Sequence, residues 1–318
     1  MTKKVAIYNG LPCHYEMFGY IIYFCLVKNY TLEIFTEKIF DTGWLQFYTN
    51  IFQSYINFKY RAYDDFENED VRNNFDIIFL TTDDDCRFKY NWMNQKVICI
   101  NHYYKCRRID YFDCLGVRPF IENKIKWGLP CFPVFDNHIK IINNDVMNVC
   151  IVGGGNLETN LYNTSVINRL KSKKKIVLHI ITRFVTKNMF TDMNIQSANE
   201  SIEIRLYQRI NTDNMFQVLR SVNYMLTDVT INNDHNTGYS MSGSIPLAFS
   251  SLSRIIISSQ NNKLYKFSSA LEFDLTTNDD IFLHDNTDET TDLIVNERDT
   301  LVKMFHDNVD EIIDKNKL

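Results

Sequence analysis

The sequence lacks several patterns that would assign it to a familiar class at once. No run of eighteen apolar residues occurs and no long apolar segment follows the first few residues, so neither a membrane helix nor a secretory signal is expected. The eight cysteines include no CxxC pair and lie mostly as single residues inside apolar patterns, as buried free thiols of a reducing, cytoplasmic protein would. His102, Cys106 and Cys114 come closest to metal-ligand spacing, but without such a pair no zinc site is expected.

An excess of basic residues is also lacking. The 34 Lys and Arg residues are outnumbered by 39 Asp and Glu residues, and the net charge of −5 argues against a dedicated nucleic-acid-binding protein. No internal repeat with a period of 20–50 residues is visible, which argues against a solenoid or a propeller. With 318 residues, of which 45% are hydrophobic, the chain is long enough for two domains that each bury a core.

Short apolar runs alternate with helical patterns through most of the chain. Strands are expected in the first half at residues 5–9, 32–36, 57–62, 75–81 and 96–101, and in the second half at 147–152, 176–182, 202–207, 223–227, 255–257, 270–274 and 281–283. Helices are expected at residues 14–28, 43–52, 161–172, 215–221, from 242 onward, and 289–315. This alternation is typical of parallel βαβ units.

The alternation fades between residues 112 and 144, where glycines and prolines gather, and this stretch is the expected connection between domains. The sequence therefore predicts an α/β protein with two Rossmann-like parallel-sheet domains, the first over residues 1–140 and the second over 145–288. Residues 289–318 form a long C-terminal helix that could pack back on the first domain.

Ligands of open α/β sheets bind beyond the carboxyl ends of the strands, so the residues that follow each strand are the candidates for a site. In the second half these residues suit an anion, and they are Gly153, Gly154, Gly155, Asn156, Arg183, Ser242, Gly243 and Ser244. In the first half they are titratable, and they are His14, Asp83, Asp84 and His102. This division predicts a reaction on a phosphate-bearing donor, with acid–base groups supplied by the first half.

The segment Ser242-Gly243-Ser244 follows a strand and opens a helix. Small residues at a helix start leave the first N–H groups uncovered, and those groups attract a phosphate together with the helix dipole. Pro246 fits early in such a helix, where its missing N–H costs nothing. Arg183 could pair with the same diphosphate or be a surface cation.

The glycines at 153–155 match neither the spaced GxGxxG dinucleotide pattern nor the GxxxxGK[ST] loop, which disfavours a Rossmann oxidoreductase. They could form a phosphate-binding loop or only a tight turn from strand to helix. His235, beside Asp234, could contact the donor sugar or lie in a loop without a ligand.

His14 lies where the first crossover helix is expected to start, and its ordinary pKa suits a general base near neutral pH. It could instead be a helix cap or a packing residue, and His102 is a weaker candidate of the same kind. Asp83 and Asp85 could hold Mg²⁺ or Mn²⁺ on a diphosphate, or they could be part of a solvated turn.

These features together resemble the two-domain B-type (GT-B) glycosyltransferases. The segment SMSGSIPLAFSSLSRIIISSQNNKLYKF is similar to their nucleotide-sugar segment, in which a small-residue helix start precedes "PLA", a helix and an apolar strand. Gly153–Asn156 matches their first donor-side loop, and His14 matches the acceptor-side loop in which some inverting members place a base. The resemblance implies transfer of a sugar from a nucleoside-diphosphate sugar to a hydroxyl of a carbohydrate or glycoconjugate.

Retaining members of these families carry a glutamate pair at a spacing of E-x7-E, whereas this chain has Asp234 and then Ser242. This departure argues against a standard retaining enzyme and leaves inverting chemistry or a degenerate site open. If the enzyme is inverting, the resemblance implies direct displacement with His14 or Asp84 as the base, Asp83 and His102 on the acceptor side, and no metal or other cofactor. Two alternatives stay open: a metal-dependent A-type glycosyltransferase that uses Asp83 and Asp85, and a non-catalytic nucleotide- or sugar-binding protein.

Overall fold

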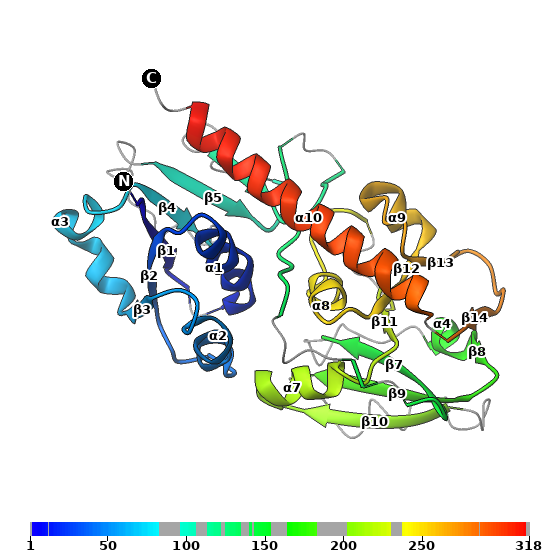
Figure 1. Cartoon of the computed structure of the whole chain (residues 1–318). Helices are drawn as coiled ribbons and strands as arrows, with labels where there is room; N and C mark the ends of the chain where they lie inside the picture. The colour runs from blue at the N-terminus through cyan, green and yellow to red at the C-terminus, as the bar shows by residue number, and fades with distance from the viewer. Residues whose placement is uncertain are drawn as a thin grey trace. The chain divides into compact units, whose positions relative to one another are not determined.

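The computed structural model describes residues 2–11, 13–82, 96–105, 113–121, 125–134, 140–141, 143–153, 164–182, 202–229, 237–285 and 287–315. The chain forms two compact units (Figure 1). Unit 1 comprises Met1–Phe132 and Thr300–Leu318, and unit 2 comprises Pro133–Asp299.

Unit 1 is built on a six-stranded sheet whose strands are ordered β3-β2-β1-β4-β5-β6 and are all parallel. The strands are β1 (Lys4–Asn9), β2 (Thr31–Thr36), β3 (Phe58–Arg61), β4 (Ile77–Leu80), β5 (Val97–Asn101) and β6 (Asp113–Gly116). The helical segments are η1 (Tyr15–Met17), α1 (Phe18–Val27), α2 (Trp44–Phe52), η2 (Tyr63–Glu67) and α3 (Glu69–Arg72). Strands β4 and β5 are buried at every residue, as strands covered on both faces by helices must be.

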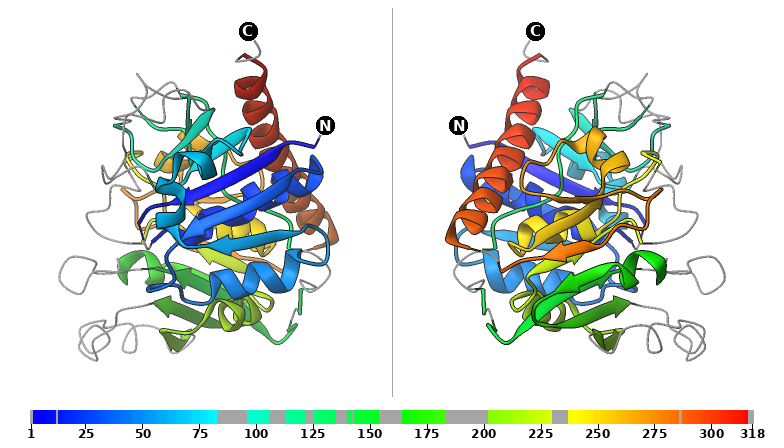
Figure 2. Two further views of the ribbon diagram at one scale, coloured as in Figure 1. Left: turned by 90° about the vertical axis from the view of Figure 1, so that its left-hand side faces the viewer. Right: turned by 90° about the vertical axis from the view of Figure 1, so that its right-hand side faces the viewer.

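Unit 2 repeats this plan with the order β10-β9-β7-β11-β12-β13 (Figures 1 and 2). The strands are β7 (Val146–Val152), β9 (Lys175–Thr182), β10 (Ile202–Gln208), β11 (Tyr224–Leu226), β12 (Arg254–Ser258) and β13 (Leu271–Phe273). The helices are α4 (Thr164–Asn168), α7 (Thr212–Leu219), α8 (Ser244–Ser250) and α9 (Ser259–Tyr265). A separate two-stranded sheet pairs β8 (Leu170–Ser172) with β14 (Ile281–Leu283).

The last helix, α10 (Asp288–Lys315), begins in unit 2 and continues into unit 1. Within unit 1, Phe305 packs on Tyr20 with ring centroids 4.2 Å apart, and Asn308 donates a hydrogen bond to the carbonyl of Trp127. Asp310 forms an ion pair with Lys28 at the end of α1. Helix α1 and the last part of α10 therefore pack together through several aromatic contacts.

The predicted fold class is confirmed, since both halves are parallel α/β sheets and a long helix ends the chain. Two local predictions are wrong. The first crossover helix begins at Phe18 rather than at His14, because residues 15–17 form a 3-10 turn and His14 takes a left-handed conformation with φ 58°. The helix expected at 161–172 ends at Asn168, because residues 170–172 pair with a strand more than a hundred residues later.

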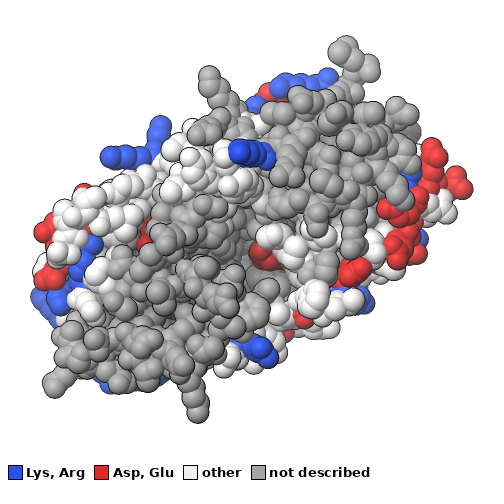
Figure 3. Space-filling model, turned by 180° about the vertical axis from the view of Figure 1, so that it is seen from behind, with Lys and Arg blue, Asp and Glu red and all other residues white. Residues whose placement is uncertain are grey.

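On the face drawn in Figure 3, many of the acidic side chains of the described residues gather toward the right-hand edge. Lysine and arginine side chains of the described residues lie on this face in separate groups among acidic and uncharged residues (Figure 3). None of the helices in the described part of the chain combines the length and the apolarity that a bilayer crossing needs.

Candidate functional site at the switch points of the two sheets

Both sheets have the strand order in which the first and fourth strands lie side by side and the chain then proceeds outward in opposite directions. At such a switch point the loops after the two central strands diverge and leave a place for a ligand at the carboxyl edge. The central pairs are β1 and β4 in unit 1 and β7 and β11 in unit 2. Each unit therefore has a candidate ligand site of its own.

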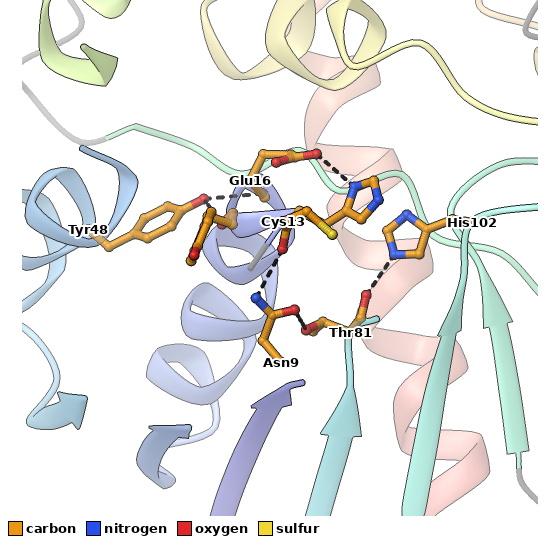
Figure 4. Close-up of polar contacts among 8 residues, drawn as sticks. Asn9, Cys13, Glu16, Tyr48, Thr81 and His102 are labelled. Carbon is orange, nitrogen blue, oxygen red and sulfur yellow. Dashed lines mark hydrogen bonds and ion pairs between the residues drawn. The ribbon is translucent and has the colours of Figure 1, made fainter. Parts of the chain in front are cut away.

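At the switch point of unit 1, polar side chains at the strand ends form a hydrogen-bonded network. Asn9, the last residue of β1, donates to the hydroxyl of Thr36 at 3.2 Å and to the carbonyl of Cys13 at 3.0 Å. The hydroxyl of Thr81 in turn donates to the side-chain oxygen of Asn9 at 3.2 Å (Figure 4). Because these groups are buried and bonded to one another, they fix the loop after β1 against the ends of β2 and β4.

His14 is held above this network by Glu16. The Nδ1 atom of His14 lies 3.1 Å from a carboxylate oxygen of Glu16, and the two side chains are 36% and 29% exposed. The left-handed backbone of His14 brings the imidazole back over the carboxylate two residues later, and such a conformation is uncommon for a residue other than glycine. An ionised carboxylate can only accept a hydrogen bond, so it fixes Nδ1 of His14 as the donor, and Nε2 is the nitrogen that can take up or release a proton.

Helix α2 supports the same turn from the side. The hydroxyl of Tyr48 lies 3.1 Å from the carbonyl oxygens of both Tyr15 and Glu16 and donates to them (Figure 4). Tyr48 is fully buried, and burial raises its pKa well above the ordinary value, so it stays a neutral donor. The position of Glu16 is therefore set by the core of the unit.

His102 follows β5 and lies beside His14, with ring centroids 4.3 Å apart. Its Nε2 atom lies 2.7 Å from the carbonyl of Thr81 (Figure 4), and since a carbonyl only accepts, this nitrogen carries the proton. Burial, followed by the charge of His14, lowers the pKa of His102, so this second imidazole is neutral.

The charges in the cluster favour a protonated His14. Burial alone would lower its pKa, but hydrogen bonds to Cys13 and Glu16 and the charge of Glu16 outweigh burial and raise the pKa of His14 to about 10. For Glu16 the signs are reversed. Burial acts to raise its pKa, but the hydrogen bond and the charge of His14 outweigh burial and lower that pKa. Since about a third of each side chain meets solvent, water screens the pair. The pKa shifts therefore favour a positively charged His14 beside a negatively charged Glu16, with a neutral His102 next to them.

The switch point of unit 2 has a different chemical character. Gly153 follows β7 with φ 103°, a conformation that favours glycine, and its N–H donates to the carbonyl of Ile181. The hydroxyl of Ser244, the first residue of α8, donates to the carbonyl of Val152 at 2.6 Å. This bond fastens the start of α8 to the end of β7.

Two glycines face open space at this edge. A Cβ atom added to Gly153 or to Gly243 would meet no atom of the described residues within 4 Å, apart from the neighbours along the chain. Gly243 is the N-cap of α8; the N–H of Ser244 donates to the Ser242 hydroxyl at 3.4 Å, and the N–H of Ile245 donates to the Ser242 carbonyl at 3.1 Å. The edge therefore presents backbone and small side chains, which suits close approach of an anion to N–H groups.

Asp228, which follows β11, has a structural role. Asp228 is buried with φ 60°, and its carboxylate accepts from the N–H and the hydroxyl of Ser258 and from the amide of Asn261. These three donors account for the burial of the charge and join β11 to the start of α9.

The structure thus brings His14 and His102 together in unit 1, and Gly153, Ser242, Gly243 and Ser244 together in unit 2. Asp83, Asp84, Asp85, Gly154, Gly155, Asn156, Arg183, Asp234 and His235 lie outside the described residues. Sequence reasoning missed Glu16 and Tyr48. The spacing His-x-Glu was a signal for the first, whereas Tyr48 resembles any other core aromatic in the sequence.

Known structures with a similar fold cover almost the whole chain. HepE of Anabaena, solved in complex with UDP and glucose, is 8% identical, with a TM-score of 0.56 over 98% of this chain and 100% of that chain. AviGT4, a glycosyltransferase of avilamycin A biosynthesis, is 8% identical, with a TM-score of 0.57 over 98% of each chain. WaaB, a lipopolysaccharide outer core galactosyltransferase, is 11% identical, with a TM-score of 0.54 over 97% of this chain and 99% of that chain.

Identities this low establish the fold and leave function to the residues at the site. No protein-family model and no curated protein sequence matches the chain.

Proposed function

We propose that this chain, which has the fold of the two-domain B-type glycosyltransferases, transfers a sugar from a nucleoside-diphosphate sugar to an acceptor hydroxyl. The observation that carries the proposal is that two sheets with the same strand order have different functional groups at their carboxyl edges. Unit 1 has a fixed histidine–carboxylate pair at its switch point, and unit 2 has an open edge of glycines and serines at the corresponding place.

Unit 2 would hold the donor. The N–H groups around Gly243 and Ser244 would bind the diphosphate, with Ser242 and Gly153 beside it. Gly154, Gly155, Asn156 and Arg183 remain proposed donor contacts. The UDP and glucose bound to HepE support a uridine nucleotide as the first donor to test.

Unit 1 would act on the acceptor. In an inverting displacement the acceptor oxygen attacks the anomeric carbon as its bond to the diphosphate oxygen breaks, and the electron pair leaves with the diphosphate. The acceptor proton passes to Nε2 of His14, while Glu16 stabilises the imidazolium that forms. Amide groups at the start of α8 would stabilise the leaving diphosphate, so the proposal needs no metal.

The raised pKa of His14 has a direct consequence for this role. A base must be unprotonated before it acts, so kcat/KM is expected to rise with pH between 6.5, the ordinary value, and about 10. Asp84 remains the second candidate base, and Asp83 and His102 remain acceptor-side candidates.

The alternatives make different demands. An A-type, metal-dependent enzyme would place its donor contacts in the first half of the chain, and the complete second sheet favours donor binding in unit 2 instead. A non-catalytic binding protein would bind the nucleotide sugar and release no nucleotide.

A melting-temperature screen with UDP-, GDP-, ADP- and CMP-sugars, followed by assays of nucleotide release with carbohydrate acceptors, tests the proposal. A ligand at 100 times its Kd should stabilise the fold by about 2.7 kcal/mol. A shift with turnover supports a glycosyltransferase, and a shift without turnover supports a binding protein. The absence of both would exclude the proposed function.

A further inference from the structure

The turn after β2 carries two apolar side chains where turns normally carry polar ones. The N–H of Asp41 donates to the carbonyl of Lys38 at 3.1 Å, so Ile39 and Phe40 occupy the two central positions. These positions favour Gly, Pro, Asn, Asp and Ser. Ile39 is 75% exposed and Phe40 is 62% exposed; among the large hydrophobic residues that the structure describes, none exceeds these values and only Ile141 equals that of Phe40.

Hydrogen bonds fix the backbone of the turn at residues 38–41. The buried hydroxyl of Tyr15 donates to the carbonyl of Glu37 at 2.9 Å, and the backbone N–H of Phe40 donates to the same hydroxyl. The carboxylate of Asp41 accepts from the N–H groups of Gly43 and Trp44 and so caps α2. The apolar side chains are therefore presented to solvent by a backbone with several fixed points.

The turn lies at the same sheet edge as the histidine pair. Strand β2 pairs with β1 up to Thr36 and Asn9, and the hydrogen bond between these two side chains joins the loops that come after them. Tyr15, which holds the turn, is the residue after His14. The turn that carries Ile39 and Phe40 is thus joined by hydrogen bonds to the loop that carries His14, the candidate base.

We propose that Ile39 and Phe40 bind an apolar portion of the acceptor, so that the acceptor is amphipathic, with a hydroxylated head and an alkyl or aryl chain. This inference rests on the proposed function, because it takes the acceptor hydroxyl to react beside His14. Two side chains expose far less than the roughly 800 Å² that each partner buries in a stable protein complex. They suffice for a chain of several carbons.

Isothermal titration with n-alkyl glucosides, galactosides and N-acetylglucosaminides from methyl to hexyl, below their micelle concentrations, tests the inference. A chain that buries about half of each methylene should bind about two-fold more tightly for each one added. The double variant Ile39→Ser/Phe40→Ser should lose this dependence on chain length. Phe282→Ser is the matched control, since Phe282 is 58% exposed in unit 2 and should leave the dependence unchanged.

An equal dependence in the double variant and the wild type would overturn the inference, as would no dependence in any of the three series. Vesicles of phosphatidylcholine with phosphatidylglycerol provide the second arm. If the double variant loses only vesicle binding, the turn serves a membrane surface and the inference is wrong. The nucleotide-dependent melting shift, measured on the same variants, separates these results from a failure of the proposed function, which would remove that shift from the wild type.

Discussion

The two six-stranded sheets have the same strand order and differ in the loops after their central strands. In unit 1 the loop after β1 carries a histidine that bonds to a glutamate, and a buried tyrosine that donates to the carbonyl of Glu37. In unit 2 the loop after β7 begins with a left-handed glycine, and the nearest helix starts with serine and glycine. The same strand order thus carries a histidine–carboxylate pair in one unit and small residues in the other, because the loops supply the functional groups and the topology only positions them.

The largest expected effect comes from His14. His14→Ala should lower kcat about 10²- to 10⁴-fold, the usual contribution of a general base, and leave the melting shift with the nucleotide sugar intact. Steady-state nucleotide release and thermal unfolding measure the two effects. His284→Ala, at an exposed histidine in unit 2, is the control and should keep its activity. A fully active His14→Ala variant would remove His14 from the mechanism.

The corresponding change in unit 2 is Gly243→Trp. The indole would fill the open space beside the start of α8 and exclude a diphosphate, so the stabilisation of about 2.7 kcal/mol at 100 times Kd should disappear. Gly243 has φ −61°, which any residue adopts, so the fold should persist, and Gly243→Ala should keep most of the shift. If the tryptophan variant binds the nucleotide sugar as the wild type does, the donor lies elsewhere.

His179 in unit 2, which is buried, and His306 in unit 1, which is half-buried, extend the comparison to stability. His179 in unit 2 lies 3.0 Å from both Tyr207 and Asn148, whereas Nε2 of His306 in unit 1 has no hydrogen-bond partner among the described residues. His179→Phe should therefore cost about 1–3 kcal/mol, because it removes the hydrogen-bond partner of the buried Asn148 side chain, and His306→Phe should cost less. Urea unfolding at pH 7 measures both variants. An equal cost would contradict the hydrogen-bond argument.

The same histidines predict a pH dependence with a definite sign. Burial, as the first cause, lowers the pKa of each to about 4. Each therefore contributes stability that is present above 6.5 and is lost as pH falls through about 4, because the unfolded state binds the proton first. His306→Phe should flatten the fall in melting temperature between these pH values, and an unchanged slope would show that His306 is not buried in its neutral form.

The smallest effect concerns Glu16. Glu16→Gln removes the charge that favours the imidazolium, so the pKa of His14 should fall and the rise of kcat/KM should move toward lower pH. A pH–rate profile and an NMR titration of the His14 ring test this in parallel. If the profile moves while the NMR titration does not, another group is the base.

Most of the strands were predictable because each is a short apolar run bounded by polar residues, as in 77–80 and 176–182. Strand β6 was not, because Asp113 and Gly116 leave only two apolar residues to signal it. Strand β8 depends on pairing with β14, which no local pattern of Leu170-Lys171-Ser172 reveals.

At the candidate site, the sequence indicated which residues come after the strands, and this was enough to choose His14, His102 and Ser242–Ser244. It could not indicate the left-handed backbone at His14, which depends on Tyr48 and Glu16 packing from a different helix and turn. The protonation states of the two imidazoles depend on that packing and on burial, so they too needed the structure.

Hydrogen–deuterium exchange with and without the nucleotide that gives the largest melting shift tests the division of roles most directly. We expect slower exchange at the amides of residues 152–153, 242–245 and 247 in unit 2, with residues 13–17 of unit 1 unchanged until an acceptor is added. Protection by the nucleotide confined to residues 13–17 would contradict it.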